Sequence, residues 1–523
     1  MAYQEDISIA EKVQEIVQLR SVPFSKEGLA LITKAYEFAE AAHKDHKRYS
    51  GEPYMIHLHE TAKNLSKLGM GSVTVAAGLL HDVLEDTGIE AQTLKNAFDD
   101  EIVSLVEGVT KLGTIKYRGL KRHTESLRKF FIAMSKDIRV LIIKLADRLH
   151  NMQTLAHVPE HKRKRIAEET LEIFAPLAYR LGMRALNREL EDLAFPYVYP
   201  EEHAQIKKLL KQKSKEIEKH LEKNLRLLRK ALGKEGVRSI HISYRIKGLY
   251  STYRKWLRKN KDIDAIYDIS ALRIVVLNVH DCYQVLGIIH GLWRPMPGRI
   301  KDYIAFPKPN GYQGIHTTIF TDDGTIIEVQ IRTEAMDQEA EYGIASHYIY
   351  KEGGKPSKEA NNFIRLMQLL SYRTWFSEDT GESKTKVGAP GKTHAPLWVQ
   401  QLAEAQAEIT EPQEFFANLR ADFFQHRVFV FTPAGDVVDL PVNSTPIDFA
   451  YAIHSDIGDH IAGAKVNGKL ISLDKTLNNG DVVEIQTKQS SKPSAKWLEF
   501  VKTGVAKHKI QTALERRKQS HMQ

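Results

Sequence analysis

The spacing of the apolar residues changes along this chain, and the change limits what the chain can fold into. From residue 1 to about residue 200, apolar side chains recur every three or four positions, as in KEGLALITKAYEFAEAAHK and TVAAGLLHDVLEDT. This period predicts helices almost throughout. A highly charged stretch with leucine and isoleucine at helical intervals follows from Glu201 to Lys234 and ends at Gly236. It predicts one long amphipathic connector helix.

From about Val237 the pattern is that of strands with helices between them. Alternating β-branched residues in SIHISYRIKG and IYDISALRIVVLNV predict strands, and DCYQVLGIIHGLW predicts a helix. HTTIFTDDGTIIEVQIRT predicts two strands around an Asp-Asp-Gly turn. We therefore expect a mixed α/β domain, followed by an exposed loop or linker from Ser377 to Thr393.

The last strand-rich segment is small, from about Arg427 to Thr487. Two short strands, one helix and two more strands predict a β-grasp, ubiquitin-like module. The whole chain is expected to be multidomain: an all-α domain over 1–200, a helical connector over 201–236, an α/β domain over 237–376, a linker and helical segment over 377–426, the β-grasp module over 427–488, and the basic start of a further helical region over 489–523.

The composition favours a cytoplasmic protein with polyanionic partners. A length of 523 residues, 42% of them hydrophobic and 27% charged, fits several globular domains. No apolar stretch approaches the roughly 20 residues of a membrane-spanning helix, and the acidic start is unlike a signal peptide. The single cysteine, Cys282, fits a reducing compartment. The net charge of +9 favours polyanions, whereas the basic tail from Lys488 is either weak support for RNA contact or a solvated face.

A first cluster of metal-binding residue types lies in the all-α region. His81 and Asp82 follow the apolar run VAAGLL, and Glu85 and Asp86 come one helical turn later. A spacing of four residues puts His81 with Glu85, and Asp82 with Asp86, on one face of a helix. Imidazole and carboxylates bind Mn, Fe, Zn or Mg, and spare carboxylates can position or deprotonate a water for phosphoester hydrolysis. A lone His-Asp pair, however, arises by chance, and HDVLED also fits a solvated acidic helix end.

Two further strings strengthen the metal interpretation. SGEPYMIHLHETA puts His57 just inside a helix that begins after Pro53. LIIKLADRLHNMQTL puts Asp147 at the end of an apolar run, and Asn151 and Thr154 follow it. A charged residue that ends an apolar helix face needs a partner, and a metal ion is a suitable one.

These strings resemble the hydrolase half of the RelA/SpoT homologues, the stringent-response enzymes that make and destroy guanosine tetra- and pentaphosphate. The similarity lies in SGEPYMIH, LLHDVLEDT, LVEGVTKLG and DIRVLIIKLADRLHNMQTL. It implies a metal site, typically for manganese, a water oriented by acidic side chains, and a nucleotide pocket. The implied metal ligands are His57, His81, Asp82 and Asp147, the water-orienting residues are Glu85 and Asp86, and the nucleotide-binding residues are Arg48, Ser50, Asn151 and Thr154.

The sequence departs from the family pattern beside this site. The family usually has Arg-Lys-Ser-Gly where this chain has RYSG at residues 48–51, and a turn usually built on Gly-Gln is KDH at residues 44–46. Loss of a lysine near a polyphosphate is expected to weaken binding or to shift selectivity. The metal and catalytic set is nevertheless complete, so active hydrolysis is expected.

The middle domain carries a second, strongly basic cluster. Arg and Lys hold phosphates, and Tyr or Arg offers a flat surface to a base. Basic clusters are usually solvent-exposed surface residues without a ligand. Here, however, Asp268 and Glu328 lie among the basic residues. Carboxylates among cations favour a site for Mg²⁺ that bridges triphosphate oxygens. Glu328 is also a candidate base for a ribose hydroxyl. The basic cluster and its neighbours are Arg245, Lys247, Lys255, Arg299, Lys301, Lys308, Asn310, Tyr312 and His316.

Residues 237–352 resemble the synthetase domain of the same family, through YDISALRIVV, DCYQVLGIIHGLW, PGRIKDYIAFPKPNGYQ and EVQIRTEAMDQEAEYGIASHY. The resemblance implies transfer of the β,γ-pyrophosphate of ATP to the 3′-hydroxyl of GDP or GTP. It makes Asp268 and Glu328 the magnesium ligands, places the ATP phosphates on three basic residues, and has Tyr312 stack on the acceptor guanine. Those basic residues are Arg245, Lys247 and Lys255, and Arg273 and Gln313 join the nucleotide-binding set.

Residues 299–302, RIKD, have the basic form of the family's bifunctional members. Two glycines depart from the pattern: Gly248 stands where the family commonly has His, and Gly314 begins Gly-Ile-His where Ser-Leu-His is usual. The charged residues are present, so synthesis is expected.

The C-terminal module resembles a TGS domain, through FVFTPAGDVVDLP, AYAIHSDIG and GAKVNGKLISLDKTLNNGDVVEI. In this family the module inspects the 3′ end of deacylated tRNA on the ribosome, and the resemblance carries that contact to His454. Alternatively, His454 is a structural residue whose side chain forms a hydrogen bond at the end of a helix. The closing basic segment resembles the start of the helical region of long members, whose later regulatory domains are absent here; the chain is either naturally short or truncated.

The leading hypothesis is a bifunctional alarmone synthetase and hydrolase switched by tRNA and ribosome contact. One alternative is a hydrolase whose synthetase domain is weak or regulatory, and another is a non-enzymatic ribosome- or RNA-binding regulator. Two opposing activities would cycle futilely without control. We therefore hypothesise that nucleotide in one site biases the other through the helices between about 150 and 235.

Overall fold

The computed structural model describes residues 7–113, 137–237, 239–263, 266, 269–308, 311–322, 324–346, 427–433, 437–478 and 480–520. The chain divides into two compact units, Met1–Ile102 with Ile142–Lys355, and Val103–Leu141 with Pro356–Gln523. The linker and helical segment expected over 377–426 lies outside the described residues. Among the described residues, no helix is both long and apolar enough to cross a membrane.

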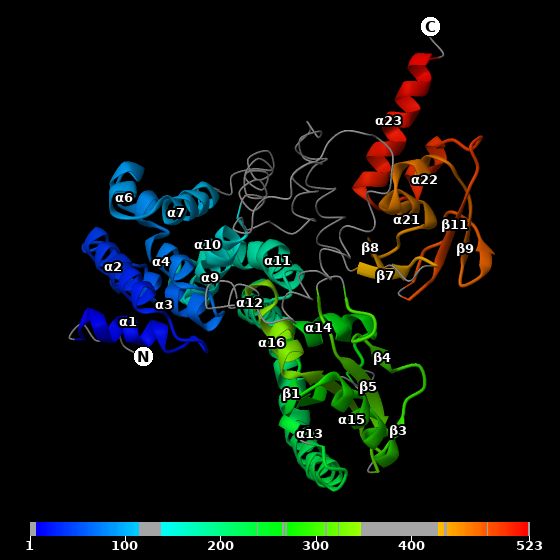
Figure 1. Cartoon of the computed structure of the whole chain (residues 1–523), viewed down its shortest axis with the longest axis horizontal. Coiled ribbons are helices and arrows are strands. Elements are labelled where there is room, and N and C mark those ends of the chain that lie inside the picture. Colours follow the sequence, from blue (N-terminus) through cyan, green and yellow to red (C-terminus); the bar gives the residue numbers. More distant parts are fainter. Residues whose placement is uncertain are drawn as a thin grey trace. The chain divides into compact units, whose positions relative to one another are not determined.

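The described N-terminal region consists mainly of helices (Figure 1). Ser8 and Glu11 form a reciprocal capping box at the first helix, and Ser25 accepts a hydrogen bond from the N–H of Gly28 at the start of the second. The helices are α1 (Ile9–Val17), α2 (Lys26–Ala42), α3 (Met55–Lys67), α4 (Ser72–Leu80), α5 (Val83–Asp86), α6 (Ala91–Ala97), α7 (Asp100–Gly113), α9 (Arg139–Gln153), the 3₁₀ turn Leu155–His157, α10 (Glu160–Glu169), the π turn Thr170–Phe174, α11 (Ala175–Arg180) and α12 (Arg184–Val198).

Helices α3 and α4 approach each other closely because a glycine lies at their contact. A methyl group on Gly78 would come within 2.2 Å of Cδ1 of Leu65, a contact no real side chain tolerates. Leu65, Leu58 and Leu79 are fully buried around this crossing. The crossing brings His57 on α3 close to the end of α4.

His81-Asp82 and Glu85-Asp86 were expected on one continuous helix, but that helix is interrupted. Helix α4 ends at Leu80, His81 and Asp82 form a turn, and α5 is a separate helix of 4 residues. The expectation of one continuous helix face is therefore wrong. Asp82, with φ −97° and ψ −3°, leaves the helical path, although its carbonyl still accepts hydrogen bonds from the N–H groups of Glu85 and Asp86 at 3.1 and 2.9 Å.

The middle domain is a mixed sheet covered by helices (Figure 1). The strand order is β1-β2-β6-β5-β3, with β4 paired to β5; β2 and β6 are parallel, and the other pairs are antiparallel. The two strands expected around the Asp-Asp-Gly turn are confirmed as β5 and β6. The elements are α13 (Pro200–Lys234), β1 (Ser239–Ile246), α14 (Leu249–Arg258), β2 (Ser270–Val276), α15 (Val279–Leu292), β3 (Arg294–Pro295), β4 (Lys301–Asp302), β5 (Ile315–Phe320), β6 (Ile326–Thr333) and α16 (Glu334–Tyr342).

Helix α13 is more than a spacer. It is a single helix of 35 residues that starts with Pro200 at its first turn, where proline's fixed φ favours a helix start. In its second half, Leu221, Leu228 and Leu232 are buried in the same core as the sheet residues and α15. The connector is thus packed into the domain that follows it.

Helix α12 joins the all-α region to the middle domain. Asp192 of α12 accepts a hydrogen bond from the backbone N–H of Tyr250 at 2.9 Å, which satisfies a free donor at the start of α14. Gly248 lies immediately before α14, and a Cβ there would come within 2.8 Å of Oδ2 of Asp192. The glycine that departs from the family pattern therefore makes room for this carboxylate.

The C-terminal module has two small sheets, β10-β9-β11 and β7-β8, joined by a parallel bridge between Phe431 and Val482. Three strands follow its helices, so the prediction of two strands at this point is wrong. Asn467 and Gly468, with φ of 53° and 78°, form a tight turn that splits one expected strand into a hairpin. The elements are β7 (Arg427–Phe431), β8 (Val437–Pro441), α21 (Pro446–Ile453), α22 (Ser455–Asp459), β9 (Ile461–Val466), β10 (Lys469–Ile471), β11 (Val483–Thr487), the 3₁₀ turn Ala495–Glu499 and α23 (Gly504–Ser520).

Candidate metal centre and nucleotide pocket

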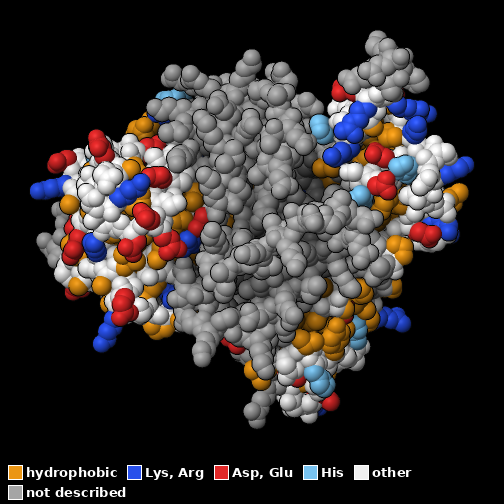
Figure 2. Space-filling model, turned by 45° about the horizontal axis from the view of Figure 1, so that its top comes forward, with side chains coloured by type: hydrophobic (Ala, Val, Ile, Leu, Met, Phe, Trp, Pro, Cys, Tyr) orange, Lys and Arg blue, Asp and Glu red, His pale blue; other side chains and the backbone are white. Residues whose placement is uncertain are grey.

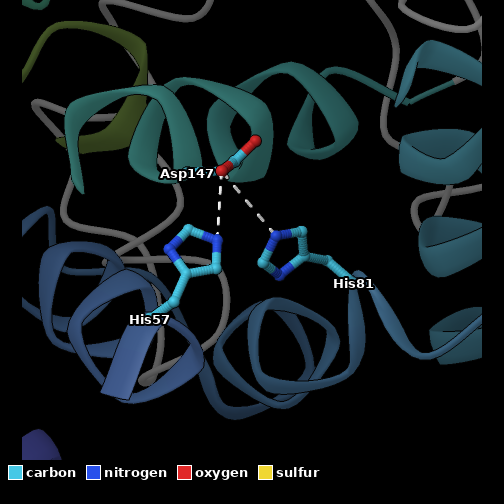
Figure 3. Close-up of side chains that lie close together, drawn as sticks. All are labelled: His57, His81 and Asp147. Carbon is cyan, nitrogen blue, oxygen red and sulfur yellow. Dashed lines mark ion pairs between the residues drawn. The ribbon is translucent and has the colours of Figure 1, made fainter. Parts of the chain in front are cut away.

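A compact cluster of imidazole and carboxylate groups lies at the meeting point of α3, α9 and the turn after α4 (Figure 3). Nε2 of His57 lies 3.2 Å from Oδ1 of Asp147 and 3.5 Å from Oδ2 of Asp82. Nε2 of His81 lies 3.0 Å from Oδ2 of Asp82 and 3.9 Å from Oδ1 of Asp147. All four residues are buried. The structure therefore brings together the complete predicted ligand set.

The hydrogen bonds at the other ring nitrogens turn both Nε2 atoms toward the carboxylates. Nδ1 of His81 lies 2.8 Å from the carbonyl oxygen of Gly78, so this nitrogen carries the proton. Nδ1 of His57 lies 2.8 Å from Nδ1 of His150. Burial and the nearby His57 and Arg48 lower the pKa of His150 to about 3, so His150 is neutral. A metal ion at Nε2 of His57 would leave the proton on Nδ1 of His57, which then donates to His150. Metal-binding histidines are commonly oriented in this way.

Both carboxylates are held in the ionised form. Burial alone would raise the pKa of Asp147, but the ammonium of Lys144, 2.6 Å from Oδ2, and the nearby histidines hold it far below its usual value. Burial opposes ionisation of Asp82 as well, and His81 and His57 outweigh it. The hydroxyl of Tyr54 donates to Oδ2 of Asp82 at 2.8 Å. Sequence reasoning did not identify Lys144, Tyr54 or His150, because each reaches the cluster through tertiary contacts.

This cluster fits a divalent metal ion. One nitrogen each from His57 and His81 and one oxygen from Asp147 lie within 4.8 Å of one another. Nε2 of His81 is buried and makes no hydrogen bond, although Asp82 is close. A buried, orphaned nitrogen that faces carboxylates is the arrangement expected of ligands around a common cation. Imidazole and carboxylate donors suit several first-row metals.

Glu85 and Asp86 lie at the exposed edge of the cluster on α5. Partial burial and the neighbouring carboxylates raise the pKa of Glu85, against the opposing effect of Lys144. A carboxylate with a raised pKa accepts a proton from water more readily. The position and charge of Glu85 suit the predicted water-orienting role.

A line of polar contacts leads from the cluster to the predicted nucleotide residues. Nδ2 of Asn151 donates to Oδ1 of Asp147 at 2.5 Å. The guanidinium of Arg48 donates to Oδ1 of Asn151 at 2.9 Å and to Oγ1 of Thr154 at 3.1 Å. The structure thus places these three residues beside the predicted metal ligands.

The middle domain contains a basic cavity of about 240 Å³. Five of its lining residues belong to the predicted site. Two more, Arg258 and Lys259, were not predicted, although they follow Lys255 at three- and four-residue spacing on and just after α14. The predicted lining residues are Lys255, Arg299, Lys301, His316 and Glu328.

Glu328 is the ionised acid of this cavity. Burial would raise its pKa, but a hydrogen bond from Nδ1 of His316 at 3.0 Å and another from Gln330 lower it to about 2. Burial lowers the pKa of His316 to about 4, so the ring is neutral. Its Nε2 therefore accepts from the hydroxyl of Tyr312. Tyr312, His316 and Glu328 form one hydrogen-bonded chain.

Several predicted residues lie outside the cavity lining. Arg273 and Arg245 instead face the acidic side chains of α16: Arg273 lies 2.6 Å from Glu341 and 3.3 Å from Asp337, and Arg245 lies 3.7 Å from Glu341. These acidic partners were not predicted, because α16 reaches the two arginines through tertiary contacts. The remaining predicted residues outside the lining are Lys247, Lys308, Tyr312 and Gln313.

Tyr312 is covered, with only 3% of its surface exposed. The guanidinium of Arg184, at the start of α12, lies 3.9 Å from the centre of its ring. Arg332 lies 4.8 Å and Lys308 5.1 Å from the same centre. The ring therefore has a cation where the resemblance implies a guanine base.

Three predicted site residues make hydrogen bonds to groups nearby in the chain. The hydroxyl of Ser50 donates to a neighbouring carboxylate at 2.9 Å, and Nε2 of Gln313 is 3.5 Å from a backbone carbonyl. Nδ1 of His454 accepts from a backbone N–H at the start of α22 at 3.1 Å, which fits the helix-end alternative, while the residue remains exposed. Asp268 and Asn310 lie outside the described residues.

Comparison with known families matches three parts of this chain. Residues 35–184 match an HD domain, residues 244–355 match the region found in RelA/SpoT proteins, and residues 428–487 match a TGS domain. These matches agree with the all-α, α/β and β-grasp classes predicted for the three parts.

Curated relatives are similar along almost the whole chain. Guanosine-3′,5′-bis(diphosphate) 3′-pyrophosphohydrolase of Aquifex aeolicus is 45% identical over 93% of this chain and 64% of its own length. GTP pyrophosphokinase of Myxococcus xanthus is 43% identical over 92% of this chain and 60% of its own length. The bifunctional (p)ppGpp synthase/hydrolase SpoT of Escherichia coli is 39% identical over 96% and 67%, respectively. The chain thus spans about three-fifths of the length of the first two relatives.

Proposed function

The chain belongs to the RelA/SpoT family, and on that premise we propose that it both hydrolyses and synthesises guanosine tetra- and pentaphosphate. Hydrolysis removes the 3′-pyrophosphate to leave GDP or GTP. Synthesis transfers pyrophosphate from ATP to the 3′-hydroxyl of GDP or GTP and leaves AMP. The observation that carries the proposal is the buried cluster in which the Nε2 atoms of His57 and His81 face Asp82 and Asp147.

In the hydrolase site, we assign the four residues of that cluster to a divalent ion, manganese by preference. The ion, when bound, supplies a lowered water pKa and neutralises phosphate charge. Glu85, at the exposed edge, orients a water and accepts its proton. Arg48, Asn151 and Thr154 hold the nucleotide so that its 3′-pyrophosphate lies over the cluster.

Phosphorus NMR of the reaction products tests hydrolysis. With Mn²⁺ and guanosine tetraphosphate, the protein is expected to release intact pyrophosphate and GDP, with no orthophosphate. The substitution Asp147→Asn removes one ligand charge and is expected to lower the rate at least a hundredfold. Failure of the unchanged protein to release pyrophosphate would support the non-enzymatic regulator instead.

In the synthetase site, the basic side chains of the cavity support binding of ATP phosphates. Glu328 has a pKa of about 2 and therefore holds a proton poorly. This favours Glu328 as a ligand of Mg²⁺ over Glu328 as the base for the ribose hydroxyl. Asp268 remains our second proposed magnesium ligand.

A second candidate, a hydrolase with a weak or regulatory synthetase domain, is favoured by one observation. Arg184 covers the ring of Tyr312, the residue proposed to stack on the acceptor guanine. Incubation with ATP, GDP and Mg²⁺ separates the two functions. Bifunctionality requires a 3′-pyrophosphorylated product, and its absence under every activator would leave the hydrolase alone.

We also propose contact with deacylated tRNA and the ribosome in the cytoplasm. Figure 2 shows Lys and Arg side chains gathered on the C-terminal module, and Lys509, Arg516 and Arg517 on α23 are exposed. Such a surface suits RNA phosphates. Binding of deacylated tRNA that weakens with added salt would support this contact, and a lack of binding at low salt would refute it.

A further inference from the structure

Lys162 reaches from α10 to the residue that follows Arg48 in the chain. Its ammonium donates to the hydroxyl of Tyr49 at 3.1 Å and lies 5.4 Å from the centre of the Tyr49 ring. Tyr49 itself is 66% exposed. Tyr49 occupies the position where the family resemblance leads us to expect a lysine. An ammonium is thus present beside this position but comes from a different helix.

The charge of Lys162 is available to an anion. In the described part of the chain, its polar partner is a neutral phenol and it makes no ion pair with a carboxylate. By contrast, Lys164 on the same helix lies 4.0 Å from the carboxylate of Glu168. A solvated cation beside a neutral hydroxyl offers donors that phosphate oxygens can accept.

Lys162 stands at the outer end of a continuous polar path. The path runs from the metal ligand Asp147 to Asn151 at 2.5 Å and from Asn151 to Arg48 at 2.9 Å, and Tyr49 is the next residue. Each step is a direct hydrogen bond or a peptide bond. A nucleotide held along this path with one phosphate group at the metal would extend its other phosphates toward Arg48 and Lys162.

We propose that Lys162 and Arg48 form the subsite for the 5′-phosphates of the hydrolase substrate, with Tyr49 as the residue that positions Lys162. The inference rests on the proposed hydrolase function. The substrate carries two anionic groups on opposite sides of a ribose, and the metal cluster neutralises the 3′ group. The 5′ group needs cations of its own, which Arg48 and Lys162 supply.

Steady-state hydrolysis of two substrates tests the subsite. One substrate is guanosine tetraphosphate, and the other is guanosine 3′-diphosphate, which has no 5′-phosphates. Lys162→Met is expected to raise KM about tenfold for the first and to leave KM for the second unchanged, with kcat retained for both. Lys162→Arg is expected to restore most of the affinity, because it keeps the charge.

Two further variants separate charge from position. Tyr49→Phe removes the hydroxyl and keeps the ring, so it is expected to raise KM for the tetraphosphate about threefold. The matched control Lys164→Met removes a lysine from the same helix and is expected to change neither KM. In the same assay, the inhibition constant of GDP is expected to rise about tenfold in Lys162→Met, while that of guanosine stays constant.

These assays distinguish a failure of the proposed function from a failure of the proposed subsite. If the unchanged protein hydrolyses neither substrate, the proposed function is wrong. If it hydrolyses both and Lys162→Met leaves KM for the tetraphosphate unchanged, the subsite is wrong. An equal rise in KM for both substrates also overturns it, because the effect then does not depend on the 5′-phosphates.

Discussion

At the scale of single residues, His150 decides which nitrogen of His57 faces the carboxylates. Its Nδ1 lies 2.8 Å from Nδ1 of His57, and this contact turns Nε2 of His57 toward the carboxylates. Removal of such an outer partner typically weakens metal binding about 10- to 100-fold. We therefore expect His150→Ala to lower Mn²⁺ affinity by about that factor in a calorimetric titration. The exposed His157 provides a control, and equal affinities for His150→Ala and His157→Ala would contradict the assignment.

A second residue-scale prediction concerns Lys308. Burial and the nearby Arg184 and Lys301 lower its pKa to about 7, against an ordinary value of 10.5. Between these values the folded protein holds Lys308 neutral while the unfolded chain holds it charged, so the unfolded state binds more protons and stability rises with pH. Relative to Lys308→Met, the unchanged protein is expected to gain about 1–2 kcal/mol between pH 7 and 9. Parallel pH profiles of denaturant unfolding for the two proteins would show that the pKa is not lowered.

The sequence predicted the residues of the candidate metal site because each lies in a short, distinctive string. It could not predict their supports in the same way. Lys144 and Tyr54 look like an ordinary helix lysine and a loop tyrosine until folding places them against Asp147 and Asp82. Outer partners depend on tertiary contacts, and no local spacing encodes them.

At the scale of elements, the close crossing of α3 and α4 sets the distance between His57 and His81. Gly78→Ala would put a methyl group 2.2 Å from Cδ1 of Leu65. Overpacking of this kind costs about 1–3 kcal/mol, because the buried Leu65 side chain or the helices themselves must shift to relieve it. We expect a lower melting temperature together with weaker Mn²⁺ binding.

Gly287 of α15 provides the matched control for that substitution. It also lies inside a helix, but a Cβ there meets no atom within 4 Å. Gly287→Ala is expected to leave Mn²⁺ binding unchanged and to raise stability by up to about 1 kcal/mol, since alanine favours a helix over glycine. Indistinguishable Mn²⁺ affinities for the two variants would contradict the role given to the crossing.

Helices and strands were predictable where the apolar residues follow one spacing, either helical or alternating. The strands β5 and β6 and the helix α15 lie where the sequence pattern predicted them. The break at His81 and Asp82 was not predictable, because the sequence spacing there continues to fit a helix while tertiary contacts to the two side chains favour a turn. The extra hairpin in the C-terminal module was signalled by Asn467-Gly468, a turn signal that the strand count overlooked.

At the scale of the whole molecule, α12 contacts elements of both proposed sites: its Glu189 accepts a hydrogen bond at 2.9 Å from Nε2 of Gln153, the last residue of α9, which carries Asp147. The first residue of α12, Arg184, covers Tyr312, and its Asp192 satisfies the start of α14, which carries Lys255 of the basic cavity. A movement of α12 would therefore act on both the acceptor side and the ATP side of the synthetase site. This supports the hypothesis of reciprocal control through these helices.

Arg184→Ala tests this connection. Removal of the guanidinium is expected to free the ring of Tyr312, so that KM for GDP in synthesis falls and the rate at low GDP rises several-fold. Arg226→Ala, whose side chain is 78% exposed on α13, is the control and is expected to leave synthesis unchanged. A synthesis rate that Arg184→Ala leaves unchanged or lowers would show that the contact does not restrain the site.

We propose that one chain holds two separate active sites with opposing activities. The most direct measurement is of both initial rates, pyrophosphate release with Mn²⁺ and pyrophosphate transfer with Mg²⁺, on the same preparations of the unchanged protein, Asp82→Asn and Glu328→Gln. We expect Asp82→Asn to lose hydrolysis and keep synthesis, and Glu328→Gln to lose synthesis and keep hydrolysis. Loss of both activities in either variant, or hydrolysis that survives Asp82→Asn, would contradict the proposal.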